Sequence, residues 1–232
     1  MKVIKKEIMC PRCGQIFESE ELISGWSDGA DLDTRMRGTI RYWTTHNYNK
    51  CPECGCVFDD EKEPLFLNDD AYDWLIKEVT ERFEDETVQA ALILREYLTY
   101  QFYTMDDDLT ISEFKGMCID RLARSNRLIW ALDDAGEDAT DERYEKIYLI
   151  NSILDLYLFE EDWFEDLQIM RVEENRRLGN FKEVMEDFVL IKDPFKQKII
   201  AYERHLASIG DDKVHGINEV DNFIANEEEN GE

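Results

Sequence analysis

Apolar residues recur at spacings of three and four along most of the chain after residue 68, which is the pattern of helices that bury one side. This part of the chain contains a single proline, Pro194, so long helices can form on either side of it. The spacing predicts helices over residues 69–83, 87–103, 112–133, 141–159, 161–178, 181–191 and 195–208.

Several of these predicted helices carry the usual end signals. Thr140 precedes two acidic residues, Gly179 follows a periodic stretch as a C-terminal stop, Asn180 can cap the next helix, and Pro194 suits a first turn. The predicted helix 141–159 is apolar on more than one face, so we expect it to lie between neighbours in a layered stack.

The first 60 residues follow a different pattern, in which short alternating runs predict strands. Residues 2–9 and 16–18 alternate loosely, and residues 39–44 are rich in β-branched and aromatic side chains. The sequence therefore predicts a small β module at the N-terminus.

Two octapeptides in this module match each other, with CPRCGQIF at residues 10–17 and CPECGCVF at residues 51–58. Two thiolates three residues apart hold one side of a tetrahedral metal, and two such pairs complete a four-thiolate shell. We therefore predict one structural zinc ion, Zn2+, bound by Cys10, Cys13, Cys51 and Cys54. Zinc binding of roughly 10–16 kcal/mol would stabilise a module of this size.

Two further residues near the second octapeptide are alternative ligands. Cys56 adjoins the Cys51 and Cys54 pair, and His46 lies a few residues before it. Four thiolates close the shell and leave no position for a water molecule, which argues against hydrolysis at this metal.

The rest of the chain offers no recognisable catalytic motif. It has no glycine-rich phosphate loop and no nucleophile elbow, and its histidines stand apart. Carboxylate pairs such as Glu173 and Glu174 are frequent, and in a chain with 54 acidic residues we expect them on solvated faces. The sequence therefore predicts a protein that is not an enzyme.

These patterns together predict an α+β fold that is mainly α. The expected domains are a four-cysteine zinc-ribbon module over residues 1–62, a helical domain over residues 63–212, and an acidic tail over residues 213–232 that frays.

The net charge of −27 is concentrated after residue 60, since residues 1–60 contribute −2 and the remainder −25. Such a surface repels phosphate, which argues against binding of the helical part to nucleic acid or an anionic membrane and favours a basic protein partner. Cysteines in metal spacing, with no signal peptide and no long apolar run, lead us to expect a soluble cytoplasmic protein.

Residues 178–194 resemble the second half of a tetratricopeptide repeat. The similarity lies in a Gly179-Asn180-Phe181 corner, an aromatic Phe188, and a closing Pro194. The sequence departs from that family at Val184, which replaces the usual alanine, and in a short second helix. The resemblance implies a tetratricopeptide-like helical array.

The whole arrangement also resembles bacterial proteins that join a CPxCG…CPxCG module with a Trp-Ser-Asp-Gly stretch, here residues 26–29, to a tetratricopeptide-like domain. That resemblance implies an architecture and no activity.

We derive two hypotheses of function. In the first, the chain is a non-enzymatic interaction or scaffold protein whose acidic helical surface binds a basic protein partner. In the second, its carboxylates imitate phosphates and occupy the groove of a nucleic-acid-binding protein.

A third possibility is that a basic face of the zinc module binds nucleic acid. This would require four cations to be exposed together, namely Lys5, Lys6, Arg12 and Arg41. Trp26 and Trp43 are either core residues of the module or anchors of a binding face.

Overall fold

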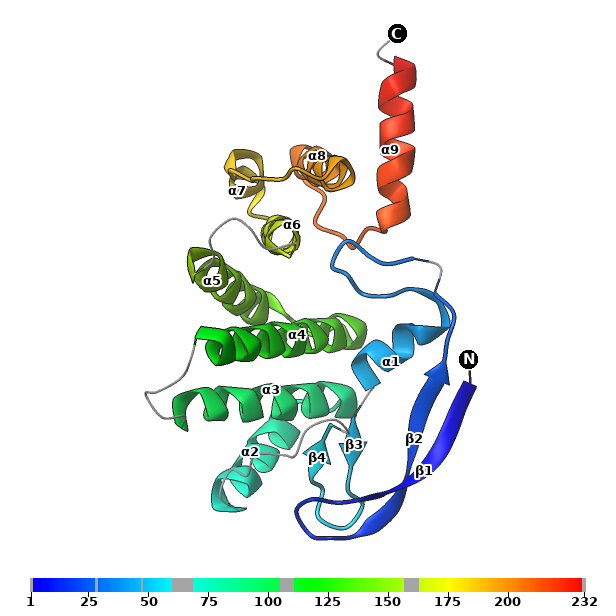
Figure 1. Ribbon diagram of the computed structural model, residues 1–232, viewed down its shortest axis with the longest axis vertical. Coiled ribbons are helices and arrows are strands. Elements are labelled where there is room, and N and C mark those ends of the chain that lie inside the picture. The colour runs from blue at the N-terminus through cyan, green and yellow to red at the C-terminus, as the bar shows by residue number, and fades with distance from the viewer. Residues whose placement is uncertain are drawn as a thin grey trace. The chain divides into compact units, whose positions relative to one another are not determined.

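The computed structural model describes residues 2–27, 29–46, 48–59, 69–104, 111–156 and 163–230. Its described part is mainly helical (Figure 1). The chain divides into two compact units. Unit 1 contains Met1–Trp26 and Thr39–Ala139, and unit 2 contains Ser27–Gly38 and Thr140–Glu232. Each unit is described by itself below.

The N-terminal part of unit 1 consists of two small antiparallel sheets. Strand β1 (Lys2–Met9) pairs with β2 (Ile16–Ser24), with Ile8 opposite Phe17, and β3 (Asn49–Lys50) pairs with β4 (Val57–Phe58). One side of the long hairpin faces the core, since Ile8 and Phe17 pack against it. The predicted β module is thus present in part.

The predicted strand at residues 39–44 is wrong. These residues form a 3-10 turn, Gly38–Ile40, followed by helix α1 (Arg41–His46). Helix α1 packs on α3 and α4, and such packing decides between helix and strand for β-branched and aromatic residues. Within α1, the Thr44 hydroxyl donates to the Arg41 carbonyl at 2.6 Å.

Three longer helices complete unit 1, namely α2 (Asp69–Arg82), α3 (Glu86–Thr104) and α4 (Ile111–Ala135). Asp85 caps α3 by accepting from the backbone N–H groups of Thr87 and Val88 at 2.8 and 3.0 Å.

The octapeptides and the helices of unit 1 share one apolar core. Cys10, Cys51 and Phe58 belong to the same buried cluster as Val88 and Leu128. The Tyr72 hydroxyl of α2 also accepts the backbone N–H of Val57 at 2.8 Å. The described parts of residues 1–26 and 39–59 are therefore grouped with the first helices, whereas residues 27–38 belong to unit 2. The domain boundary expected at residue 62 lies outside the described residues.

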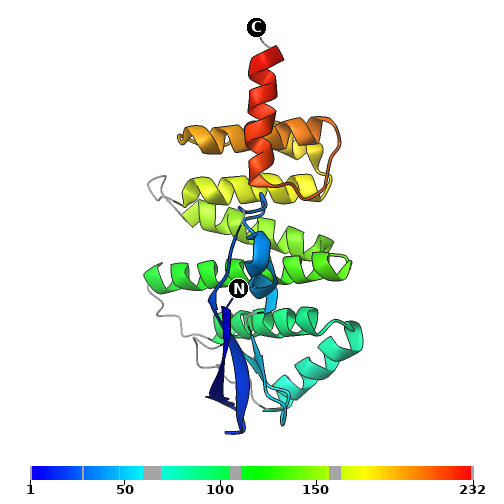
Figure 2. The same cartoon turned by 90° about the vertical axis from the view of Figure 1, so that its right-hand side faces the viewer.

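Unit 2 is a stack of helices (Figure 2). Helices α5 (Thr140–Leu156), α6 (Phe164–Arg177), α7 (Phe181–Glu186) and α8 (Pro194–Ser208) pack in succession, and α6 also contacts α8. Pro194 lies in the first turn of α8, where the Asp193 side chain accepts from the N–H groups of Phe195 and Lys196, so the predicted position of this proline is confirmed.

The helix predicted over residues 181–191 ends at Glu186, and the residues before α8 contain no further helix. The connection between α7 and α8 is held by side chains of α6, which form hydrogen bonds with its backbone groups. The Gln168 amide donates to the Leu190 carbonyl at 3.1 Å and accepts from the Leu190 N–H at 2.6 Å. Glu165 accepts from the Lys192 N–H at 2.7 Å.

The segment expected as a fraying tail contains helix α9 (Ile217–Asn230). The reason is an apolar stripe within the acidic sequence, because Val220 is fully buried and Phe223 packs against the same cluster on α8. The helix runs across the direction of α8 (Figures 1 and 2).

Residues 27–38 are the part of unit 2 that comes from far away in the sequence. The Leu32 N–H donates to the His215 carbonyl at 2.9 Å, and the Ile217 N–H donates to the Ala30 carbonyl at 3.0 Å. Arg37 forms an ion pair with Asp31 and donates to Asn218 on α9 at 3.3 Å. This segment thus helps to place the start of α9.

Among the described helices, none combines the length and the apolar character that crossing a membrane requires.

We predict that replacing Gln168 by Leu lowers the free energy of unfolding of unit 2 by about 1–3 kcal/mol, because both polar backbone groups of Leu190 would lose their partner. Urea unfolding measures the loss, and hydrogen exchange should place it at residues 187–193. Gln197→Leu is the matched control, since this exposed amide donates a single bond to Ile191. Equal effects of both substitutions would contradict the role of Gln168.

Candidate metal centre

The two cysteine pairs lie on turns with the same backbone hydrogen bonds. The Gly14 N–H donates to the Cys10 carbonyl, and the Gly55 N–H donates to the Cys51 carbonyl, each at 2.9 Å. Both glycines have a positive φ, +75° and +70°, a conformation that other residues adopt at a cost. The repeated C-P-x-C-G pattern therefore folds locally into two similar knuckles.

The two knuckles bring their four sulfur atoms together. The Sγ atoms of Cys10 and Cys54 are 3.6 Å apart, as are those of Cys13 and Cys51, and all four lie within 4.8 Å of one another. A tetrahedral ion with sulfur ligands at about 2.3 Å requires sulfur separations of about 3.8 Å. The geometry therefore fits a metal ion held by Cys10, Cys13, Cys51 and Cys54.

The site is buried on one side and open on the other. Cys10 and Cys51 are each 1% exposed, Cys54 is half-buried, and Cys13 is exposed. Cys10 and Cys51 also pack in the core shared with the helices of unit 1, so a metal ion held by the four cysteines would lie at the edge of that core.

The thiols of the site do not ionise independently. Burial raises the pKa of Cys10, but hydrogen bonds from the backbone of Cys13 and Arg12 outweigh burial and bring this pKa down to about 7. Burial and the neighbouring sulfurs raise the pKa of Cys54. Without a bound cation, ionisation of one thiol therefore makes ionisation of its neighbours less favourable. A divalent metal ion would compensate the charge of the additional thiolates.

The two alternative ligands lie outside this group. Cys56 is buried, and burial raises the pKa of its thiol to about 11. Both ring nitrogens of His46 already contact hydroxyl groups, Nδ1 that of Thr45 at 2.9 Å and Nε2 that of Thr87 at 3.0 Å. Across the residues that the structure describes, only the four predicted cysteines form a group able to hold a metal.

A neighbouring arginine connects the first knuckle to α2. Arg12 pairs with Asp73 at 3.0 Å and lies over the ring of Tyr72, 4.8 Å from its centroid. Because Tyr72 also accepts the Val57 N–H next to the second knuckle, one helix supports both halves of the site.

The basic residues considered for a nucleic-acid face are paired with acids. Lys5 pairs with Glu18 at 3.0 Å, and Lys6 pairs with Glu21 at 3.4 Å. Arg12 pairs with Asp73, and Arg41 with Asp134 at 3.7 Å. The four cations therefore face carboxylates and do not form a continuous positive patch.

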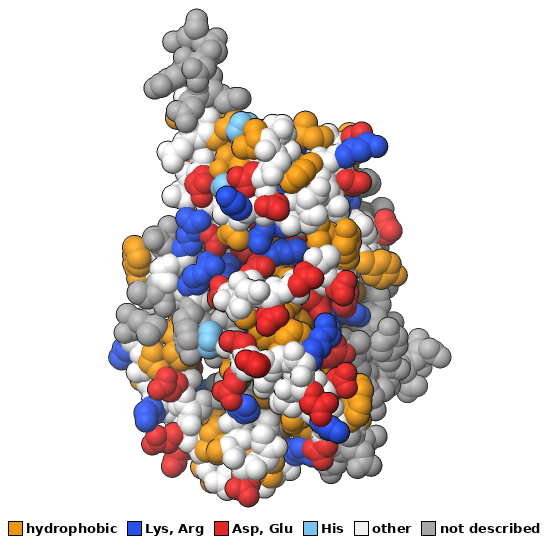
Figure 3. Space-filling model, turned by 180° about the vertical axis from the view of Figure 1, so that it is seen from behind, with side chains coloured by type: hydrophobic (Ala, Val, Ile, Leu, Met, Phe, Trp, Pro, Cys, Tyr) orange, Lys and Arg blue, Asp and Glu red, His pale blue; other side chains and the backbone are white. Residues whose placement is uncertain are grey.

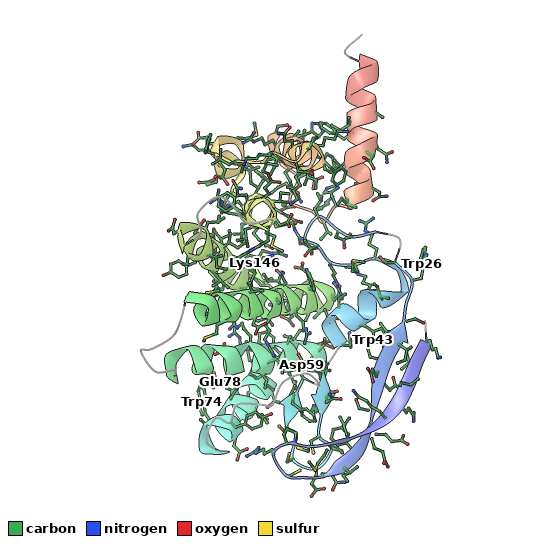
Figure 4. All side chains as sticks on the ribbon, in the orientation of Figure 1. Trp26, Trp43, Asp59, Trp74, Glu78 and Lys146 are labelled. Atoms are coloured by element: carbon green, nitrogen blue, oxygen red, sulfur yellow. The ribbon has the colours of Figure 1, made fainter. Side chains whose placement is uncertain are left out.

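The two tryptophans of the module differ in burial. Trp26 is 61% exposed and projects from the chain (Figure 4), so it is not a core residue. Trp43 on α1 is half-buried.

Sequence analysis missed a buried charged cluster in unit 2. The expectation that Glu173 and Glu174 lie on a solvated face is wrong, since they are 0% and 1% exposed. Other buried members of the cluster are Arg143, Lys146, Arg176 and Glu203, with Lys146 on α5 (Figure 4). The ion pairs cross between helices, so helical periodicity gives no signal for them.

Comparison of the chain with protein-family models, with curated proteins and with solved structures finds no match.

We predict that the purified protein contains about one metal ion per chain and that Cys54→Ser abolishes its retention, because a four-ligand shell loses one thiolate. Native mass spectrometry measures both. Cys56→Ser is the matched control and should retain the metal. Loss of metal in the Cys56 variant would place Cys56 in the shell.

Acid should release the metal, since protons compete for the thiolates. We expect the apparent affinity to fall steadily as the pH drops below about 7, where Cys10 also gains its proton in the metal-free protein. Competition with a chelator at several pH values measures this dependence, and a flat profile would contradict thiolate ligation.

Proposed function

We propose that this chain is a non-enzymatic interaction or scaffold protein, in which a structural zinc ion holds the N-terminal module and a tetratricopeptide-like helical unit binds a protein partner. The observation that carries the proposal is a set of exposed large apolar side chains on unit 2. They come from α5, α7 and the connection that follows α7.

We call this set of side chains the Arg171 face. It comprises Tyr144, Tyr148, Met185, Phe188 and Leu190. Tyr148 and Phe188 each expose 76% of their surface, the largest fraction among the described large apolar side chains. Aromatic side chains held by a rigid scaffold are the usual anchors of protein interfaces.

Arg171 of α6 holds the two sides of this face in place. Its guanidinium donates to Asn151 of α5 at 3.1 Å and binds both carboxylate oxygens of Asp187 at 2.8 and 3.0 Å. Tyr148 lies three residues before Asn151, and Phe188 directly follows Asp187, so the arginine bonds to residues close in sequence to both aromatic side chains. Arg204 further fixes the Asp187 carbonyl at 2.8 Å.

Charge around this face supports a basic partner. Asp155 of α5 and Glu183 and Glu186 of α7 are exposed, and the chain as a whole carries −27. Acidic residues around an apolar anchor accelerate the association of cationic partners and select against anionic ones.

The metal site supports a structural role for the zinc ion. Four thiolates would occupy all positions of a tetrahedral zinc ion and leave none for water or substrate. When bound, zinc would cross-link the two knuckles through Cys10, Cys13, Cys51 and Cys54.

The alternative, a nucleic-acid mimic, has weaker support. A mimic needs ranks of exposed carboxylates, yet Glu173, Glu174 and Glu203 are buried in ion pairs. On the face seen in Figure 3, acidic side chains are interspersed with lysine and arginine.

The test is a tagged pull-down from the source cell, with and without nuclease, at low and moderate salt. We expect a defined protein that survives nuclease and moderate salt, and whose recovery falls at least about tenfold with Phe188→Asp, as for an interface anchor. Ile209→Asp is the matched control, because Ile209 is also exposed but lies outside the Arg171 face.

Equal losses for both variants would contradict binding at the Arg171 face. Recovery of nucleic-acid-binding proteins that added DNA or RNA displaces, with strong loss at moderate salt, would favour the mimic instead.

A further inference from the structure

The four sulfur ligands of the candidate metal centre differ in exposure. Cys10 and Cys51 are each 1% exposed and Cys54 is half-buried, whereas Cys13 is exposed. A solute that approaches the centre from outside therefore meets the sulfur of Cys13 first. The reactivity of a cysteine depends on its exposure and on its thiolate character, and a thiol bound to a metal has already lost its proton. Cys13 combines both properties when the metal is bound.

The residues that follow Cys13 leave it open to solvent. Residues 14–16 are all exposed. In the second knuckle, Cys54 is followed by Gly55, which is half-buried, and by Cys56, which is buried. The two knuckles have the same backbone hydrogen bonds, so the cover around them, and not their local fold, distinguishes Cys13 from Cys54.

A second thiolate lies close to Cys13. The Sγ atoms of Cys13 and Cys51 are 3.6 Å apart, and a movement of about 1.5 Å would bring them to the length of a disulfide bond. Cys10, the other ligand of the first knuckle, lies against Cys54 at 3.6 Å. Both of these short approaches join one knuckle to the other. An oxidised Cys13 is therefore placed to react with the opposite knuckle.

We propose that Cys13 is an oxidation site, at which a hydroperoxide releases the metal ion and leaves a disulfide bond between Cys13 and Cys51. The inference rests on metal binding by the four cysteines and goes beyond the structural role proposed for the ion.

The oxidation proceeds in two steps. In the first, the sulfur of Cys13 attacks one oxygen of hydrogen peroxide, so that an S–O bond forms, the O–O bond breaks and hydroxide leaves. Cys13 is then a sulfenic acid. In the second, the thiolate of Cys51 attacks that sulfur, an S–S bond forms, the S–O bond breaks and a second hydroxide leaves. The peroxide gains the two electrons that the two sulfur atoms lose.

The oxidised protein loses the metal but keeps the loop closed. Only Cys10 and Cys54 remain as thiolates, which are too few to complete a tetrahedral shell. The disulfide joins the same two knuckles that the metal joined, so the 37 residues between Cys13 and Cys51 stay enclosed. Because thiols reduce disulfides, a reductant and free metal would restore the centre.

The test uses the whole chain loaded with zinc, and its metal content is measured before hydrogen peroxide is added. We expect peroxide to release zinc to a chromogenic chelator, in proportion to the disulfide formed. Treatment with dithiothreitol and then zinc should restore the bound metal.

Tryptic peptides identify the disulfide without further variants. Cleavage after Arg12 separates Cys10 from Cys13, and cleavage after Lys50 releases Cys51 in peptide 51–62. The expected bond therefore links peptide 13–35 to peptide 51–62, and fragmentation of the second peptide distinguishes its three cysteines.

Two histidine variants test whether Cys13 is the site of attack. Zinc accepts three thiolates and one imidazole, so replacement of one ligand by histidine keeps four donors. Cys13→His removes the exposed thiolate and should slow zinc release by at least about tenfold. Cys54→His is the matched control, because it changes the same position of the second knuckle, and it should release zinc at a rate close to that of the wild type.

Three results would overturn this inference while leaving metal binding intact. They are resistance of the zinc-loaded wild type to peroxide, a disulfide within the first knuckle between Cys10 and Cys13, and equal release rates for the two histidine variants. A purified protein that holds no metal would instead overturn the metal site and this inference with it. If a histidine variant does not retain zinc, the disulfide in the oxidised wild type decides, and any pairing other than Cys13 with Cys51 rejects the proposal.

Discussion

The closure of one loop by four sulfur atoms is the constraint on which much of this chain depends. The two halves of the metal site, Cys10 with Cys13 and Cys51 with Cys54, are separated by 37 residues. Within this loop lie β2, helix α1, and the segment Ser27–Gly38 that belongs to unit 2. A metal ion that joins the knuckles therefore fixes both ends of a segment whose middle completes a different part of the fold. Zinc binding on the order of 10–16 kcal/mol is comparable to the stability of a whole domain, so it can hold a loop of this length.

The core of unit 2 depends on electrostatic interactions as well as on apolar packing. Leu32, Val172 and Val220 form part of an apolar cluster, and ion pairs such as Arg143–Glu174 and Arg176–Glu203 lie beside it. Such pairs add little net stability compared with apolar side chains, but they penalise arrangements in which one partner is lost. They therefore favour one packing of α5, α6 and α8 over its alternatives.

The features that could be predicted from the sequence are those set by local interactions. The C-P-x-C-G repeats specify their own turns, and long helices follow from periodicity, so the four-cysteine cluster and the mainly helical fold were both accessible. Residues 39–44 could not be predicted, because packing on α3 and α4 decides their conformation. The end of α7 at Glu186 depends on Gln168 and Glu165, which act from another helix. Glu173 looks like any surface acid until α8 and residues 27–38 enclose it.

The large negative charge of the chain bears on the interaction proposed for unit 2. A net charge of −27 attracts cationic partners to exposed anchors such as Phe188. The buried carboxylates of Glu174 and Glu203 add little to that attraction, because each lies against a buried cation. The exposed acids of α5 and α7 therefore carry it, and salt weakens it by screening them.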